Sequence, residues 1–170
     1  MTSVPLWFER KFDFSFPAEL YPNICMRLRG TPARLDELLR VQLREKLIQK
    51  SDNRWSAQEQ AGHLLDLEPL WLARVEDFVA GRAELTAADL TNRKTHEASH
   101  NHVPLDQILR GFRDARSHLV SRLEAIDPSI SSRTLLHPRM KTPMCLVDHL
   151  YFVAEHDDHH LASIWELMRN

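Results

Sequence analysis

Apolar side chains recur at every third or fourth position in four separate segments of this 170-residue chain. That spacing gives each segment one apolar stripe, as in an amphipathic helix with a single buried face. The first segment starts at Thr31 and Pro32, a residue that can cap followed by a proline whose missing N–H is harmless at the first helical position. We therefore expect the first helix to begin there and to continue through the leucine-rich run that follows.

The other three helices also carry start or stop signals. Ser56 and Glu59 form a capping box, and the apolar pattern that follows continues to Gly81, a residue favoured just past a helix end. The remaining two helices are predicted at about 104–127 and at about 144–168, the last one after a second Thr–Pro pair. Four long helical segments in sequence favour an all-α protein.

Strand signals are weak throughout the chain. The opening stretch WFERKFDFSF, residues 7–16, alternates apolar and polar side chains, but Pro17 and Pro22 follow it and no partner strand is evident. We predict that this stretch is an extended arm or a short helix packed on the helices. Together these observations predict one domain over residues 1–170, folded as a four-helix bundle with an N-terminal extended arm.

Two polar linkers separate the predicted helices, at roughly 83–103 and 127–142. Both are longer than a minimal helix–helix turn, and both contain turn residues. We expect them to shape one end of the molecule or to cover a site, because long connections often carry function.

Charge and composition exclude several classes of protein. The formal net charge of −2 and the lack of a basic run give no reason to expect a nucleic-acid partner. No stretch approaches the ~20 apolar residues that cross a bilayer, and the chain start lacks the apolar core of a secretion signal, so we expect a cytoplasmic protein without membrane association. Only four glycines occur, and neither common phosphate-binding loop motif is found.

The histidines of the last predicted helix are the most informative polar residues. His156 and His160 are four residues apart, so they lie one turn apart on the apolar stripe and face the core. His159 points to the other side of His156, and Asp157 and Asp158 are expected to face water. Two imidazoles at this spacing can hold one divalent ion, although an inward histidine can also be a hydrogen-bonded core residue.

A third metal ligand is predicted on the second helix. His63 shares its helical stripe with Leu67 and Leu70, so it also faces the core. Three histidines without cysteine leave at least one coordination position for water or substrate, as in a catalytic site. A di-iron carboxylate site is disfavoured, because the only Glu-x-x-His pair, Glu97 and His100, lies in a linker.

Other polar residues near the predicted site have weaker signals. Glu59 and Asp66 lie one turn either side of His63 and could orient its second nitrogen, although the cap is the favoured role for Glu59 and Asp66 could be a surface acid. His149 is two turns before His156, too far for the same ion, and is a capped or pocket-lining histidine. We also count His159 among the pocket candidates.

Three further groups allow alternative interpretations. The stretch THEASHNH could bind a metal through the three histidines at 96, 100 and 102, but no helix fixes their geometry. Cys145 precedes His149 by four residues, a nucleophile–base spacing that lacks an orienting third group. Arg139 and Lys141 could meet an anionic substrate or could be solvated loop charges.

The stretches WSAQEQAGHLLDLE and AEHDDHH, in this order, resemble the DinB-like superfamily, also described as YfiT-like metal-dependent hydrolases. The resemblance covers most of the chain. It implies a bundle of up-down-down-up topology, often dimeric, with a divalent metal on a histidine triad that maps to His63, His156 and His160. Relatives include bacillithiol transferases and mycothiol-dependent isomerases, in which the metal activates a low-molecular-weight thiol.

The sequence therefore supports one main hypothesis and two alternatives. The main hypothesis is a homodimeric enzyme in which zinc or nickel on the triad activates a low-molecular-weight thiol or water for S-transfer, isomerisation or hydrolysis of a small-molecule substrate. The first alternative is a non-catalytic metal-binding or stress-associated interaction protein. The second is a structural oligomer in which the histidines only pack.

Overall fold

The computed structural model describes residues 3–14, 16–50 and 54–169 and is dominated by four long helices. These are α1 (Tyr21–Arg40), α3 (Ala57–Ala80), α5 (Leu105–Glu124) and α6 (Leu146–Arg169). Two short helices, α2 (Arg44–Leu47) and α4 (Arg93–Glu97), lie in the connections. Single 3-10 turns are η1 (Trp7–Glu9), η2 (Ala18–Leu20), η3 (His100–His102) and η4 (Pro128–Ser132), and the strands are β1 (Thr134–Leu136) and β2 (Pro143–Cys145).

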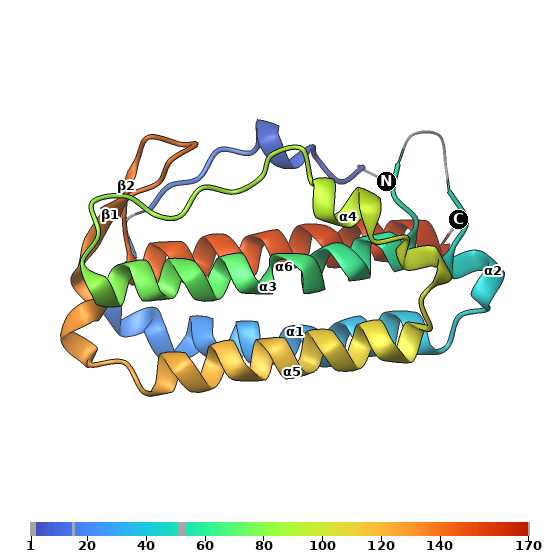
Figure 1. The fold of residues 1–170 in the computed structure, drawn as a ribbon, viewed down its shortest axis with the longest axis horizontal. Helices are drawn as coiled ribbons and strands as arrows, with labels where there is room; N and C mark the ends of the chain where they lie inside the picture. Colours follow the sequence, from blue (N-terminus) through green and yellow to red (C-terminus); the bar gives the residue numbers. More distant parts are fainter. Residues whose placement is uncertain (1–2, 15, 51–53, 170) are drawn as a thin grey trace.

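The four long helices form a bundle with up-down-down-up topology (Figure 1). Helix α1 packs on α5 and α6, and α3 packs on the same two helices from the opposite side. Helices α3 and α6 run in opposite directions, and so do α1 and α5, whereas α3 and α5 are parallel. The all-α bundle predicted from the helical periodicity is confirmed. Within the described ranges, no helix is long and apolar enough to cross a membrane.

The capping signals place the ends of α3 correctly. The Ser56 side chain accepts from the Glu59 N–H and the Glu59 carboxylate accepts from the Ser56 N–H, so both halves of the predicted capping box form. At the other end Gly81 has φ 65°, the left-handed conformation that glycine adopts without a steric penalty. Helix α5 begins directly after Pro104 and ends before Pro128, as expected.

The predicted start of the first helix is wrong. Helix α1 begins at Tyr21, so Thr31 and Pro32 lie in its interior. A proline there cannot donate to the carbonyl four residues earlier, which is that of Leu28. The Leu28 oxygen instead accepts a hydrogen bond from Arg116 Nη1 at 3.1 Å, so a side chain from α5 replaces the missing backbone donor.

The predicted start of the fourth helix is also wrong. Pro143 to Cys145 form strand β2, which pairs antiparallel with β1, and α6 begins only at Leu146. The Asp148 carboxylate accepts from the Cys145 N–H and so fixes the passage from strand to helix. The Thr–Pro pair therefore lies in a small hairpin, for which the sequence gives no clear strand signal.

The core consists of two apolar clusters separated by a polar layer. One cluster includes Leu28, Phe78 and Leu150, and the other includes Leu39, Phe112 and Ile164. Between them each long helix contributes one buried polar side chain. These are Thr31 from α1, Glu68 from α3, Arg116 from α5 and Asp157 from α6.

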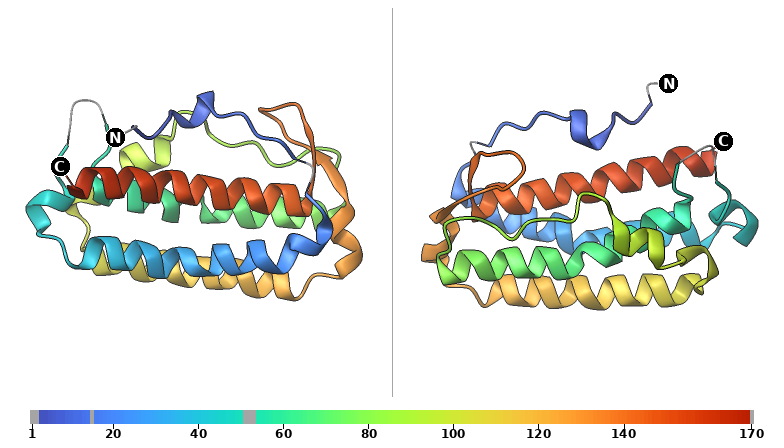
Figure 2. Two further views of the ribbon diagram at one scale, coloured as in Figure 1. Left: turned by 180° about the vertical axis from the view of Figure 1, so that it is seen from behind. Right: turned by 45° about the horizontal axis from the view of Figure 1, so that its top comes forward.

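The N-terminal arm and the first linker cover the seam between α3 and α6 (Figures 1 and 2). The arm is extended apart from the single turn η1, and the Trp7 ring packs against Phe12 and Phe152. The prediction of an extended arm packed on the bundle is confirmed. The linker runs back along α3 before it reaches α4 and η3, so α5 can start at the same end of the bundle as α3.

Candidate metal centre

The three histidines predicted as metal ligands lie together on the seam between α3 and α6. His63 comes from α3, and His156 and His160 come from successive turns of α6. One ring nitrogen of each lies within 4.8 Å of the others. All three side chains are buried, with at most 6% of their surface exposed.

The second ring nitrogen of His63 has a defined partner. Nδ1 lies 3.0 Å from Thr95 Oγ1, and that hydroxyl donates to Asp66 Oδ2 at 3.0 Å. Because the single hydroxyl hydrogen of Thr95 goes to Asp66, its oxygen must accept from His63. The proton of the neutral ring is therefore on Nδ1, and the Nε2 lone pair is free to bind a metal.

His160 has the same arrangement with a different partner. Its Nδ1 is hydrogen-bonded to Gln60 Oε1, an amide oxygen that can only accept, so its Nε2 also carries a lone pair. That nitrogen lies 3.1 Å from His156 Nε2. His156 Nδ1 is buried without a hydrogen-bond partner in the described chain. Two of the three imidazoles are thus held in the tautomer that presents Nε2 as a ligand.

Burial keeps the three imidazoles neutral. It lowers the pKa of His63 to about 4, although the charge of nearby Asp66 opposes that shift. Burial also lowers the pKa values of His156 and His160 well below the usual range, and the neighbouring histidines lower them further. Neutral imidazoles are the form that coordinates metals, so this donor set fits a divalent cation.

A cavity of about 620 Å³ opens above the triad. Its floor is formed by α3 and α6, and its roof by three connecting segments. The roof segments are the arm at residues 6–9, the first linker between residues 87 and 92, and the hairpin loop at residues 137–139. Both predicted linkers therefore line the space over the three histidines.

The other candidate residues lie at different distances from this space. Asp66 contacts His63 through Thr95 rather than directly, and it also accepts from His100 Nε2 at 2.8 Å. Glu59 belongs to the capping box and pairs with Lys50. His159 lines the cavity beside His160, with ring centroids 5.1 Å apart. His149 is not among the cavity-lining residues.

His149 is fully buried behind the cavity wall. Its ring lies 6.0 Å from Trp71 and 5.9 Å from Phe78, centroid to centroid. Neither of its nitrogens has a hydrogen-bond partner in the described chain.

The two aspartates between the histidines do not face water as predicted. Asp157 is completely buried, where it accepts from the Thr31 hydroxyl at 2.8 Å and pairs with Arg116. Asp158 is half-buried and pairs with Arg27 and Arg34 of α1. The prediction failed because α6 is covered by α1 on one side and by α3 on the other, so two of its faces are buried.

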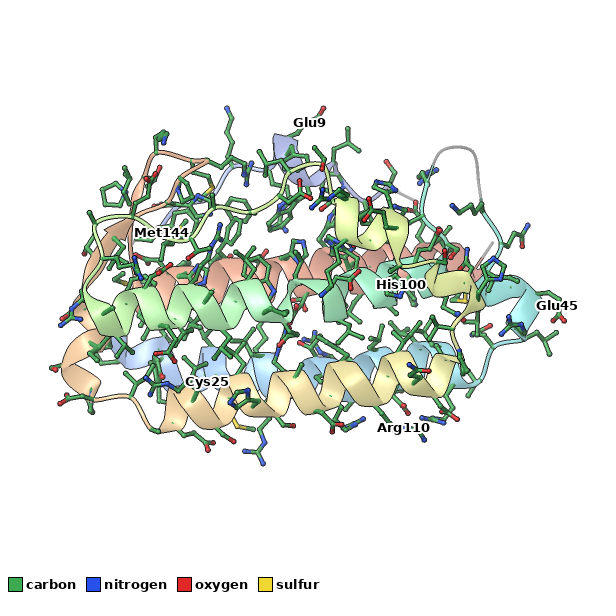
Figure 3. The ribbon with its side chains drawn as sticks, in the orientation of Figure 1. Glu9, Cys25, Glu45, His100, Arg110 and Met144 are labelled. Carbon is green, nitrogen blue, oxygen red and sulfur yellow. The ribbon has the colours of Figure 1, made fainter. Side chains whose placement is uncertain are left out.

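The partners of the triad were not found from sequence. Gln60 precedes His63 by one turn on the same helix, so the stripe that identified His63 could have included it. Thr95 lies in α4, within a linker, and no local pattern places it beside α3. Of the linker histidines, His100 is buried against the start of α3 (Figure 3), whereas His96 is exposed.

Comparison with known proteins agrees with this geometry. A sequence profile of the DinB superfamily matches residues 27–164. The chain belongs to the DinB superfamily. No curated protein sequence gives a significant match.

Two solved structures share the DinB fold seen in this chain. One is YfiT from Bacillus subtilis, described as a probable metal-dependent hydrolase with an unusual four-helix bundle topology. It is 21% identical with a TM-score of 0.80, and the match covers 95% of this chain and 93% of YfiT. The other is a mycothiol-dependent maleylpyruvate isomerase, which is 11% identical with a TM-score of 0.67. That match covers 86% of this chain and 60% of the isomerase.

Proposed function

We infer that this protein is a divalent-metal-dependent enzyme whose metal is held by His63, His156 and His160. The observation that carries the proposal is the convergence of three buried, neutral imidazoles from two helices below a cavity. Thr95 and Gln60 support it, because each holds one imidazole in the tautomer that presents Nε2. The likeness to YfiT supports the same interpretation at the level of the fold.

A bound zinc or nickel ion would lower the pKa of a thiol or water that it coordinates, so that a nucleophile is available near neutral pH. The chain contributes the binding site and the shielding around it. Trp7 covers His156 from the arm, with ring centroids 5.0 Å apart, and the linker closes the cavity from the other side. The proposed reaction is S-transfer, isomerisation or hydrolysis of a small-molecule substrate. Homodimer formation and a cytoplasmic location stay predictions of the sequence.

Elemental analysis of protein purified without a histidine tag tests the metal site. We expect about one zinc or nickel ion per chain, lost in both His63→Ala and His156→Ala. His118→Ala is the matched control, because His118 is exposed on α5. Protein that contains no metal, and takes up none on incubation with zinc or nickel, would overturn the proposal.

A second measurement separates an enzyme that uses a thiol from one that uses water. Isothermal titration compares bacillithiol, mycothiol, glutathione and coenzyme A against metal-loaded and metal-stripped protein. Metal-dependent binding of one of them supports thiol activation. Equal or absent binding in both forms excludes the thiol-dependent version of the proposal.

A further inference from the structure

The cavity has a second polar end, three helical turns from the triad. Arg74 follows His63 by eleven residues on α3, which returns it to nearly the same face of the helix about 16 Å further along the axis. It lines the same cavity as His63. The wall between the two ends is apolar and includes Leu67, Leu70 and Phe152.

Arg74 is a buried cation without a carboxylate partner. Its side chain is among the largest that are fully buried, and Nε donates to the Thr86 carbonyl at 2.8 Å. Within the described residues, no carboxylate lies at ion-pair distance from its guanidinium. Asp77 acts on it from further away, but that carboxylate already accepts from the Thr86 N–H and pairs with Arg82. Buried charges are normally paired, so this arrangement is unusual.

The group that faces Arg74 is another donor. His137 Nδ1 accepts from the backbone N–H groups of Arg139 at 3.2 Å and Met140 at 3.3 Å, so its lone pair is there. Burial, together with the charges of Arg74 and Arg139, lowers the pKa of His137 to about 4. The neutral ring must therefore carry its proton on Nε2. That nitrogen lies 3.3 Å from Arg74 Nη1, which also carries only protons.

Two donors at this distance cannot satisfy each other, whereas both can donate to one acceptor placed in the cavity. Trp71 lines the same space, and its indole N–H is buried without an acceptor in the described chain. We propose that Arg74 and His137 bind the carboxylate of an elongated substrate or cofactor whose other end reaches the histidine triad.

The charges around the Arg74 end of the cavity favour the binding of an anion. Arg139 lines the cavity as a second cation. The cavity-lining carboxylates of the described chain, Glu9 and Asp89, are both exposed. Glu9 points away from the bundle (Figure 3), and Asp89 accepts from the N–H groups of Thr91 and Arg93 within its own turn. The apolar wall between the ends selects a ligand with an apolar middle.

The placement of the ligand's reactive end at the triad rests on the function proposed above, whereas the carboxylate site is inferred from Arg74 and His137 alone.

Mercaptohexanoate, mercaptooctanoate and mercaptoundecanoate serve as probes, each paired with the mercapto alcohol of the same chain length. Binding is measured by isothermal titration with zinc-loaded and metal-stripped protein. Octanoate and octanol are the probes without a thiol.

In the wild-type protein we expect each acid that spans the cavity to bind at least about tenfold more tightly than its alcohol, with or without zinc. Arg74→Met should reduce this preference to nearly one, and Arg74→Lys should retain part of it, because the charge stays but the planar fork is lost. Arg29→Met is the matched control, since Arg29 is 63% exposed on α1 and outside the cavity. Circular dichroism establishes that each variant is folded.

The outcomes distinguish this inference from the proposed function. Equal affinity for acids and alcohols in the wild-type protein overturns the carboxylate site, even if zinc strengthens thiol binding. A preference for acids that a folded Arg74→Met variant keeps also overturns it. A preference for acids in stripped and loaded protein alike, with no gain from the thiol when zinc is present, supports the carboxylate site and counts against the metal-dependent function. The wild-type comparison needs no variant, so a misfolded Arg74→Met does not prevent the test.

Discussion

Thr95 holds the proton of the neutral His63 ring on Nδ1, so the Nε2 lone pair is free to bind a metal. In Thr95→Val the acceptor for His63 Nδ1 and the donor to Asp66 are both removed, while the shape of the side chain is kept. We expect zinc affinity to fall by about 10- to 100-fold, as is typical when a partner of a ligating histidine is lost. Competition with a chromophoric chelator measures the affinity.

The control for this change is Thr134→Val. Thr134 is exposed on β1, and its hydroxyl donates to the Ser132 carbonyl at 3.5 Å. Zinc affinity should be unchanged in this variant. Wild-type affinity in Thr95→Val would show that the position of the proton on His63 does not depend on the threonine.

Helical spacing predicts the orientation of a side chain well only where that orientation depends on its own helix alone. The separation of His156 and His160, and the shared stripe of His63, correctly indicate three inward side chains. The orientation of Asp157 could not be found in this way, because a helical wheel describes one axis and the partner, Arg116, comes from another helix. Arg74 lies on the same helical stripe as His63, but its proposed role in binding a carboxylate depends on His137. The long connection between α5 and α6 brings His137 next to Arg74.

At the scale of elements, Gly62 allows η3 to approach α3 closely. A Cβ at this position would lie 2.2 Å from Cγ of the buried His100 ring, which is held by Asp66. Gly62→Ala should therefore lower the free energy of unfolding by about 1–3 kcal/mol, since the ring or the backbone must move. Urea denaturation measures the change.

Gly30→Ala is the matched control on α1. Apart from the adjacent residues and the backbone of α1 itself, no atom of the described residues lies within 4 Å of a Cβ built there. This variant should therefore gain up to about 1 kcal/mol in the free energy of unfolding from helix propensity. Equal changes in the two variants would mean that the contact between α3 and η3 imposes no constraint.

The ends of the elements show why some boundaries are readable and others are not. The capping box at Ser56 and Glu59 is satisfied within one turn, so the sequence contains all of its parts. Pro32 and Pro143 resemble helix starts locally, but distant partners decide their places. For Pro32 the partner is Arg116, which occupies the unpaired carbonyl of Leu28, and for Pro143 it is strand β1.

At the scale of the whole molecule, Arg116 connects all four long helices. It pairs with Glu68 of α3 and Asp157 of α6, and it donates to the Leu28 carbonyl of α1. Arg116→Met leaves two buried carboxylates and one carbonyl without their partner, so we expect a loss of about 3–5 kcal/mol in the free energy of unfolding. Urea denaturation at neutral pH measures it.

Neutralising both carboxylates should recover part of this stability. The comparison is the Arg116→Met variant with Glu68→Gln and Asp157→Asn added. Arg29→Met, which breaks an exposed pair at 3.5 Å, should change stability by less than about 1 kcal/mol. If Arg116→Met lowers the free energy of unfolding by no more than Arg29→Met does, the polar layer does not hold the bundle together.

His149 makes the stability of the whole bundle depend on pH. Burial beside Trp71 and Phe78 holds the pKa of His149 well below its usual range, and the positive charge of Arg74 lowers it further. As the pH falls below about 6.5, the unfolded chain takes up a proton at this residue and the native chain does not. Folding should therefore lose roughly 2–3 kcal/mol from this residue between pH 6.5 and 4.5.

In His149→Phe that loss should disappear, because phenylalanine cannot take up a proton. The variant should also be at least as stable as the wild type at pH 7.5, since it removes two buried nitrogens that have no partner in the described chain. Urea denaturation from pH 7.5 to 4.5 tests both effects, with His118→Phe on the exposed face of α5 as control. The contributions of the carboxylates cancel when the free energy of unfolding of the variant is compared with that of the wild type at each pH. Parallel pH profiles of the two proteins would mean that His149 is protonated equally in the folded and unfolded chain.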